Sequence, residues 1–211
     1  MSDAKERKPF SETRFYPVFF MILVTAIAIG VLATFYHGTA ARVEAYRAYR
    51  HQQTVLALFD IDTTGQTPGA VAALYLQHVT DESKDGYQWY RVGQNGVLKG
   101  WAFPISGSGL WGSISAMLAV SPDYTTIERF AIVDQNETPG LGGRITESWF
   151  TGQFTGKKLG GDFTLVAEDT ASPAPAEVRQ ITGATVSSRA VATMIAREYD
   201  RISKLLELRH D

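Results

Sequence analysis

The feature that most constrains this chain is an uncharged, apolar segment near its N-terminus. No Asp, Glu, Lys or Arg occurs between Arg14 and Arg42, and residues 15–36 are almost entirely apolar. A helix of that length rises about 33 Å, enough to cross a hydrocarbon core of roughly 30 Å. Aromatic residues stand at both ends of the segment, as they do at membrane interfaces. The sequence therefore predicts a single transmembrane helix over residues 15–36.

A cleavable signal peptide is the alternative for this segment. Its apolar run is longer than a typical signal core, and Tyr36-His37 stands where a small-x-small cleavage site would be needed. Basic residues lie on both sides of the segment, with a slight bias that favours a cytoplasmic N-terminus. They are Lys5, Arg7, Lys8 and Arg14 before it, and Arg42, Arg47 and Arg50 after it. We therefore expect a cytoplasmic head over residues 1–14 and an extracytoplasmic domain after the membrane.

The composition excludes several classes of function. Among the 211 residues there is no cysteine, which rules out disulfides, iron–sulfur clusters and a cysteine nucleophile. The 20 basic and 22 acidic residues give a net charge of −2, which argues against a nucleic-acid-binding protein. The histidines do not form pairs at helical spacing, so no metal site is expected. A redox role would therefore need an organic cofactor.

The remaining pattern predicts an α+β domain. Good helix formers without Gly or Pro extend a helical connector over residues 37–60, and a Gly/Pro-bearing loop follows over residues 60–69. The domain is expected over residues 61–211. Strands are expected over 88–92, 97–103, 113–120 and 126–133, with Ser121-Pro122-Asp123 between the last two, and residues 163–168 could form a further strand. The first two flank a hairpin turn at residues 93–96, which indicates an antiparallel sheet.

Two helices are expected in the C-terminal part of the domain. A short helix is predicted over residues 146–150, and residues 169–176 are too rich in Pro and small residues for a helix or a strand. An amphipathic helix packed on the sheet is then indicated by apolar residues at helical spacing. These residues are Val191, Met194, Ile195, Ile202, Leu205 and Leu206.

The first motif that could carry chemistry is the GxGxxG sequence from Gly107 to Gly112. A dinucleotide loop needs a following helix to bind the pyrophosphate, but residues 113–120 alternate like a strand and lead into Ser121-Pro122. A Rossmann site is therefore disfavoured. The glycines still indicate close approach of the backbone to another group, and Trp111 could form a planar wall for a ring. A tight loop with a core Trp is the alternative.

The second motif is the sequence Glu-Thr-Pro-Gly-Leu-Gly-Gly over residues 137–143. Pro139-Gly140 indicates a turn, and the later glycines expose backbone N–H groups that a ligand could use. A plain turn would explain these residues but would leave Glu137 without a role.

The third motif is Ile-Thr-Gly-Ala-Thr-Val-Ser-Ser over residues 181–188, directly before the amphipathic helix. Small residues and hydroxyls at a helix N-terminus can form an anion site that suits a phosphate. Simple N-capping by Thr185, Ser187 or Ser188 is the alternative.

Taken together behind one membrane span, the three motifs resemble those of two related FMN-binding subunits. These are the G subunit of the Rnf complex and the C subunit of the sodium-pumping NADH–quinone reductase. The resemblance runs from about Gly86 to the C-terminal helix and includes the span. It implies that the phosphate of FMN is esterified to Thr185, and that a flavin transferase installs this group from FAD outside the cytoplasm. By the same resemblance, Thr182, Gly183, Ala184 and Ser187 would surround the attachment point. The isoalloxazine would be lined by Leu110, Trp111, Glu137, Thr138, Leu141 and Gly142.

The resemblance further implies an electron-carrying subunit of an ion-translocating oxidoreductase in the bacterial inner membrane. A single span without an intramembrane ionisable residue cannot translocate ions alone, so other membrane subunits are expected as partners and no catalytic residue is assigned. The compact length and Gln-Ile-Thr-Gly-Ala-Thr favour Rnf, while the first two motifs look like those of the quinone reductase. Members of the family commonly carry Asp six residues before the modified Thr. This chain has Arg179 there, which could neutralise the phosphate.

Two rival functions come from other classes. The chain could be a membrane-anchored binding or scaffold module without a flavin, but the presence of Thr185 and Glu137 argues against it. It could be a self-contained flavin reductase or regulator, but no nucleotide-binding motif supports that function. Lys157 and Lys158 are expected to be solvated, with a role near the phosphate as the alternative.

Overall fold

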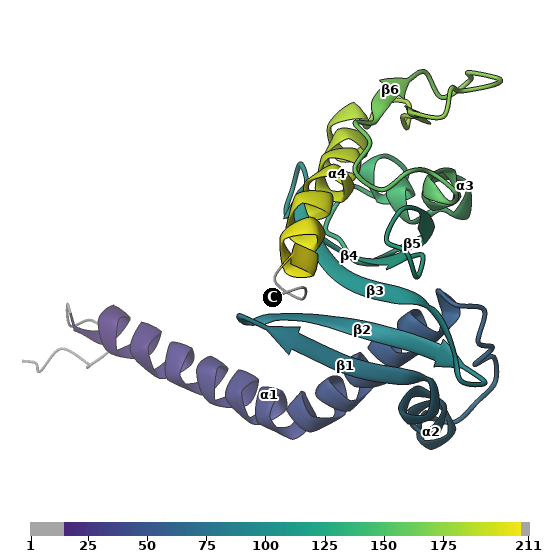
Figure 1. The fold of residues 1–211 in the computed structure, drawn as a ribbon. Helices are drawn as coiled ribbons and strands as arrows, with labels where there is room; N and C mark the ends of the chain where they lie inside the picture. Colours follow the sequence, from purple (N-terminus) through teal and green to yellow (C-terminus); the bar gives the residue numbers. More distant parts are fainter. Residues whose placement is uncertain (1–14, 208–211) are drawn as a thin grey trace, which may run out of the picture. The chain divides into compact units, whose positions relative to one another are not determined.

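The computed structural model describes residues 15–207 and confirms the predicted order of an apolar N-terminal helix followed by an α+β domain (Figure 1). The predicted cytoplasmic head, residues 1–14, lies outside the described residues. The described chain forms two compact units, one that ends at Ala48 and one that begins at Tyr49.

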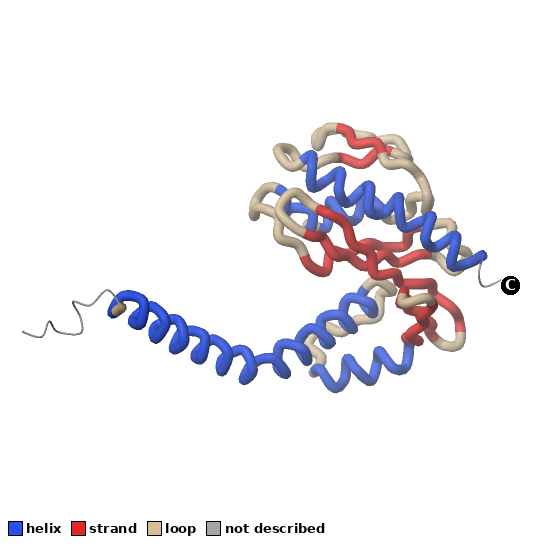
Figure 2. The backbone as a smooth tube through the Cα atoms, turned by 90° about the vertical axis from the view of Figure 1, so that its left-hand side faces the viewer, coloured by secondary structure: helices blue, strands red, loops and turns tan. Residues whose placement is uncertain are grey.

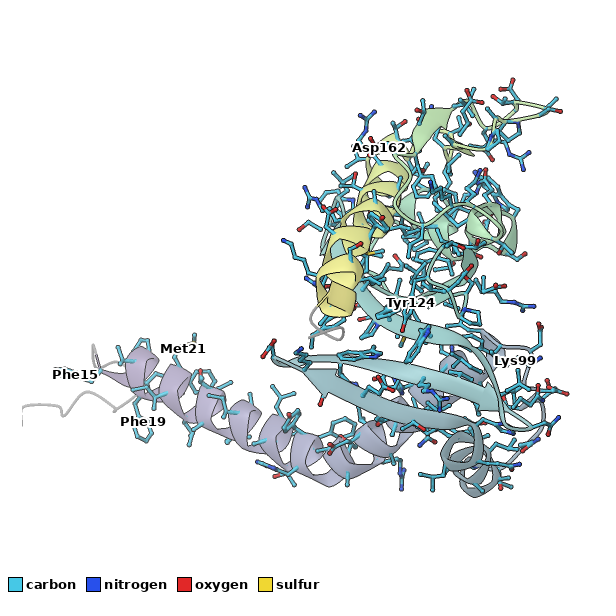
Figure 3. The ribbon with its side chains drawn as sticks, viewed as in Figure 1. Phe15, Phe19, Met21, Lys99, Tyr124 and Asp162 are labelled. Atoms are coloured by element: carbon cyan, nitrogen blue, oxygen red, sulfur yellow. The ribbon has the colours of Figure 1, made fainter. Side chains whose placement is uncertain are left out.

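The N-terminal helix α1 runs without a break over Tyr16–Ala57. It covers the predicted span and most of the predicted connector, and it is the one helix in the described chain that is long and apolar enough to cross a membrane. Its apolar side chains are exposed, as Phe19 and Met21 illustrate (Figure 3). The second compact unit begins inside the predicted connector, and the division at residue 61 stays a prediction.

The domain is built on a five-stranded antiparallel sheet with the order β1-β2-β3-β4-β5 (Figure 1). Its strands are β1 (Val79–Lys84), β2 (Tyr87–Gln94), β3 (Val97–Ser108), β4 (Ser113–Val120) and β5 (Ile127–Asp134). The predicted hairpin is confirmed between β2 and β3, where Asn95 and Gly96 have φ of 55° and 78°. Two successive positive φ values are what a type I′ turn requires.

Both faces of the sheet are buried. On β4, Ile114, Ala116 and Leu118 face one core, while Met117 and Ala119 face the other, in the alternation of a strand. The first core is closed by helix α4 (Thr185–Glu207), whose packing on the sheet confirms the predicted C-terminal helix (Figure 2). The second core is closed by the last turns of α1 and by α2 (Pro68–His78).

Several elements differ from the prediction. The loop predicted to end at residue 69 is shorter, because Thr67 accepts a hydrogen bond from Ala70 N and caps α2, which begins at Pro68. The short helix predicted over 146–150 is present as α3 (Ser148–Thr151) and begins two residues later than expected. The 3-10 helices η2 (Gly142–Thr146) and η3 (Gly152–Phe154) flank it, and the three elements contribute Ile145, Phe150 and Phe154 to the first core. The predicted strand 163–168 is reduced to β6 (Thr164–Val166), which pairs in parallel with β7 (Glu177–Arg179) apart from the main sheet.

Candidate functional site

The three predicted motifs form loops that meet at the N-terminal end of α4 (Figure 2). The first is the β3–β4 loop over residues 109–112, the second covers residues 137–143, and the third is the turn over residues 181–184 that leads into α4. These stretches are distant in sequence, and the folded domain brings them together.

The carboxylate of Glu137 connects the first two loops to the start of α4. Its Oε1 accepts hydrogen bonds from Leu110 N at 2.9 Å and Trp111 N at 3.0 Å, and its Oε2 accepts one from Ser187 Oγ at 2.5 Å. Glu137 is only 4% exposed. Charge-assisted hydrogen bonds of this kind are stronger than those between neutral groups. The residue predicted to line a flavin ring therefore lies beneath the loops, where it holds them together.

Two glycines make this close approach possible. A Cβ at Gly142 would lie 2.6 Å from Ser187 Oγ and 2.7 Å from Glu137 Oε2, and a Cβ at Gly109 would collide with Glu137 Oε1. The loop closes with a hydrogen bond from Gly109 N to Gly112 O at 2.7 Å, and a strand follows it. The GxGxxG sequence is therefore a hairpin loop that makes room for a carboxylate, which confirms that it is not a Rossmann loop.

Thr185 is the first residue of α4, and it is half-buried. The preceding Gly183 has a φ of 77°, which turns the chain into the helix. Ser188 Oγ accepts from Ile181 N and donates to Ala184 O, both at 3.0 Å. The alternative of N-capping by Thr185, Ser187 or Ser188 is wrong, since all three lie inside the helix. In the described part of the chain, the Thr185 hydroxyl makes no hydrogen bond with another protein group.

Apolar side chains project from the loops around this helix end. Leu110, Trp111 and Leu141 are 56%, 71% and 45% exposed, so Trp111 is a surface residue and the alternative of a core Trp is wrong. A Cβ at Gly183 would lie 3.2 Å from Leu141 Cδ2, so these two loops touch. Val186 is also exposed and was not predicted as a site residue. An exposed apolar residue in the first turn of an amphipathic helix is the signal that could have found it. These side chains suit a planar aromatic ligand, and the helix N-terminus beside them suits an anion.

A second carboxylate supports the turn before Thr185, and the sequence did not indicate it. Glu168 Oε1 accepts from Arg144 Nη2 at 2.8 Å, and Glu168 Oε2 accepts from Thr182 N at 2.7 Å. The hydrogen bond from Arg144, and to a smaller extent the one from Thr182, lowers the pKa of Glu168 to about 2. The group is therefore a carboxylate at neutral pH.

The segment that leads to the third motif is held by two more side chains. Gln153 Oε1 accepts from Arg179 N at 2.8 Å, and Gln153 Nε2 donates to Arg179 O at 3.1 Å. Lys157 Nζ donates to the carbonyls of Pro175 at 2.7 Å and Glu177 at 2.9 Å, so its predicted solvation is wrong. Desolvation lowers the pKa of Lys157. Lys158 is exposed, as predicted.

Comparison with known proteins relates this site to FMN-binding proteins. Residues 109–200 match the family model of the FMN-binding domain. The G subunit of the ion-translocating oxidoreductase complex of Methanosarcina acetivorans is 27% identical over 96% of this chain and 98% of its own length. The G subunit of the proton-translocating ferredoxin:NAD(+) oxidoreductase complex of Clostridium ljungdahlii is 32% identical over 54% of this chain. The chain is a homologue of these two proteins.

A more local similarity links the FMN-binding domain to the quinone reductases. The C subunit of the Na(+)-translocating NADH-quinone reductase of Vibrio anguillarum, NqrC, is 37% identical over 42% of this chain. The alignments span 60% of the Clostridium protein and 36% of the Vibrio protein.

Two solved structures of NqrC share the fold. The protein from Parabacteroides distasonis has a TM-score of 0.62 at 20% identity, over 75% of this chain and 92% of its own. The protein from Shewanella oneidensis has a TM-score of 0.60 at 19% identity, over 70% of this chain and 89% of its own. All the predicted site residues, from Leu110 to Ser187, lie within the segment that matches the FMN-binding domain.

Proposed function

We propose that this chain is the electron-carrying subunit of an Rnf-type ion-translocating oxidoreductase, with FMN attached through its phosphate to Thr185. The observation that carries the proposal is the position of Thr185. It is the first residue of α4, its hydroxyl has no protein partner among the described residues, and it lies in a segment that matches the FMN-binding domain. The Methanosarcina relative, which aligns over 98% of its own length, favours the Rnf type.

The residues present fit FMN. The free N–H groups and the dipole at the start of α4 favour the phosphate, and Thr182, Gly183 and Ala184 form the turn that presents Thr185. Leu110, Trp111 and Leu141 offer apolar surface to the isoalloxazine, with Thr138 and Gly142 in the loop beside it. Glu137 and Ser187 hold the loops from beneath. FMN, when bound, supplies the electron-transfer chemistry, and the protein positions it and tunes its potential.

Attachment would be a transfer of the FMN phosphate from FAD to the Thr185 oxygen. The bond between this phosphate and AMP breaks, AMP leaves, and the hydroxyl proton is released. A flavin transferase outside the cytoplasm would catalyse the step. In this proposal α1 anchors the chain in a bacterial inner membrane with the N-terminus in the cytoplasm, and the FMN-binding domain lies on the other side. Other membrane subunits of the complex would deliver and accept the electrons.

Two other functions are alternatives to this proposal. The equivalent subunit of a sodium-pumping NADH–quinone reductase is the second candidate, because the local similarity over the FMN-binding domain reaches 37% identity. Purification of the native complex and identification of its partner subunits would distinguish the two. A flavin-free scaffold module is the third, and it predicts a chain that never acquires flavin.

The covalent attachment is tested by co-expression with a flavin transferase. We expect flavin fluorescence in a denaturing gel and the added mass of FMN on the peptide that contains Thr185. Thr185→Ala should abolish both signals. Thr193→Ala, a change of an exposed threonine farther along α4, is the control and should retain them. Labelling that persists in Thr185→Ala, or a wild-type chain without flavin, would contradict the attachment.

A further inference from the structure

The ion pair of Arg144 and Glu168 connects two parts of the site on a side that Glu137 does not reach. Arg144 belongs to η2, directly after the loop 137–143, and Glu168 follows β6. Glu168 accepts from Arg144 Nη2 at 2.8 Å with one oxygen and from Thr182 N at 2.7 Å with the other. The side chains of Arg144 and Glu168 are each 27% exposed, so solvent screens this pair less than it screens a fully exposed one.

The contact with Thr182 acts on the turn that presents Thr185. This turn contains Gly183, which is exposed and can adopt many backbone conformations, and it closes with a hydrogen bond from Ala184 N to Ile181 O at 2.9 Å. A turn of this kind opens easily unless other groups hold it. Ser188 holds the N–H of Ile181 from inside the helix, and Glu168 holds the N–H of Thr182 from outside. Arg179, three residues before Thr182, is engaged with Gln153. The acidic group that contacts the start of the motif is therefore Glu168.

We infer that Glu168, held by Arg144, is a positioning residue for the modification of Thr185. It fixes the turn 182–184 so that the Thr185 hydroxyl is presented in one direction to the flavin transferase. The inference rests on the proposed attachment of FMN to Thr185. Because Glu168 acts through the backbone of Thr182, its removal should slow flavin incorporation without unfolding the domain.

The chain offers a matched control for the loss of one carboxylate. Glu147 also pairs with Arg144, at 3.3 Å from Arg144 Nε, but its hydrogen bonds go to Arg144 and Trp149 and not to the attachment motif. Glu147→Gln and Glu168→Gln therefore each remove one negative charge that pairs with Arg144. Only Glu168→Gln also changes the group that accepts the hydrogen bond from Thr182 N.

The experiment follows flavin incorporation into the full-length chain by a flavin transferase with FAD. Initial rates at several concentrations of the chain give kcat and KM for the wild type and the two variants. Thermal unfolding followed by circular dichroism, and amide hydrogen exchange in residues 182–184, are measured on the same samples. For Glu168→Gln we expect kcat/KM to fall about tenfold, as for the loss of one hydrogen bond to a charged group, and exchange in the turn to become faster. Glu147→Gln should stay within about twofold of the wild type, since a partly exposed ion pair contributes little.

The outcomes separate this inference from the proposed function. A wild-type chain that acquires no flavin contradicts the attachment itself, and the inference fails with it. A labelled wild type with equal kcat/KM in Glu168→Gln and Glu147→Gln would overturn the positioning role alone. A purely structural role would lower the unfolding midpoint of Glu168→Gln and leave kcat/KM of the folded chain unchanged. If Glu168→Gln does not fold, Glu168→Asp is measured instead. It keeps the charge on Arg144 but shortens the reach to Thr182, so we expect slower labelling than in the wild type, and an unchanged rate would reject the role.

Discussion

At the scale of single residues, one buried carboxylate organises the candidate site. Glu137 accepts hydrogen bonds from groups in the β3–β4 loop and in α4, which lie 26 to 50 residues away in sequence. Two of its three donors are backbone N–H groups, which leave no trace in the sequence. The motif could therefore show that Glu137 needs a role, but not that this role is to join loops.

Two substitutions of Glu137 should distinguish the stability that its hydrogen bonds contribute from the stability that its charge contributes. Glu137→Ala leaves two backbone N–H groups and the Ser187 hydroxyl without their acceptor, and we expect a loss of about 3 kcal/mol in the free energy of unfolding. Glu137→Gln keeps an acceptor for the N–H groups, and the Ser187 hydroxyl can reverse to accept, so about 1 kcal/mol is expected. Urea unfolding measures both, with Thr138→Ala at the exposed neighbouring position as the control. Equal stability of Glu137→Ala and Thr138→Ala would reject this role.

At the scale of elements, the sequence predicted those whose pattern is regular. Strands β2 to β5 lie in segments rich in apolar residues that turn residues separate, and α4 has a clear apolar face, so all five were expected. Three elements were missed for physical reasons. Helix α2 is apolar around most of its surface and has no helical period. Strand β1 is an edge strand with one buried residue and reads as polar, and β7 is only three residues long.

The approach of the loop 137–143 to α4 depends on a glycine without a side chain. Gly142→Ala would place a Cβ 2.6 Å from Ser187 Oγ, so the loop must move away from the helix. We expect a loss of about 2 kcal/mol in the free energy of unfolding, as for other overpacked positions, together with slower flavin incorporation. Gly152→Ala is the control, because its φ of −64° and ψ of −19° suit alanine and no atom lies within 4 Å of the added Cβ. Equal effects of the two changes would show that the close approach is not required.

At the scale of the whole molecule, the second core makes the end of α1 part of the compact domain. Val55, Leu56 and Leu58 are buried with residues of α2 and the sheet. The sequence predicted a connector up to residue 60 because its composition is that of an exposed helix. That composition could not show that these three residues are buried, because α2 and β1, which pack in the same core, were not predicted.

Truncation tests where the domain begins. A chain of residues 49–211 keeps Val55, Leu56 and Leu58, so we expect it to fold and remain soluble without a membrane. A chain of residues 61–211 loses all three. At about 1.5–3 kcal/mol for each buried side chain, the loss approaches the whole stability of a small domain. Circular dichroism melting curves compare the two chains. Equal midpoints would show that the end of α1 contributes nothing to the fold.

The hydrogen bonds of Glu137 also limit which segments can be exchanged between homologous domains. One carboxylate, two glycines that admit it and one serine that donates to it come from three separate stretches of the chain. A chimaera that imports residues 181–188 from a homologue with a larger residue at position 187 would need compensating changes at Gly142 and Glu137. The three stretches would therefore have to be exchanged together, although they are far apart in the sequence.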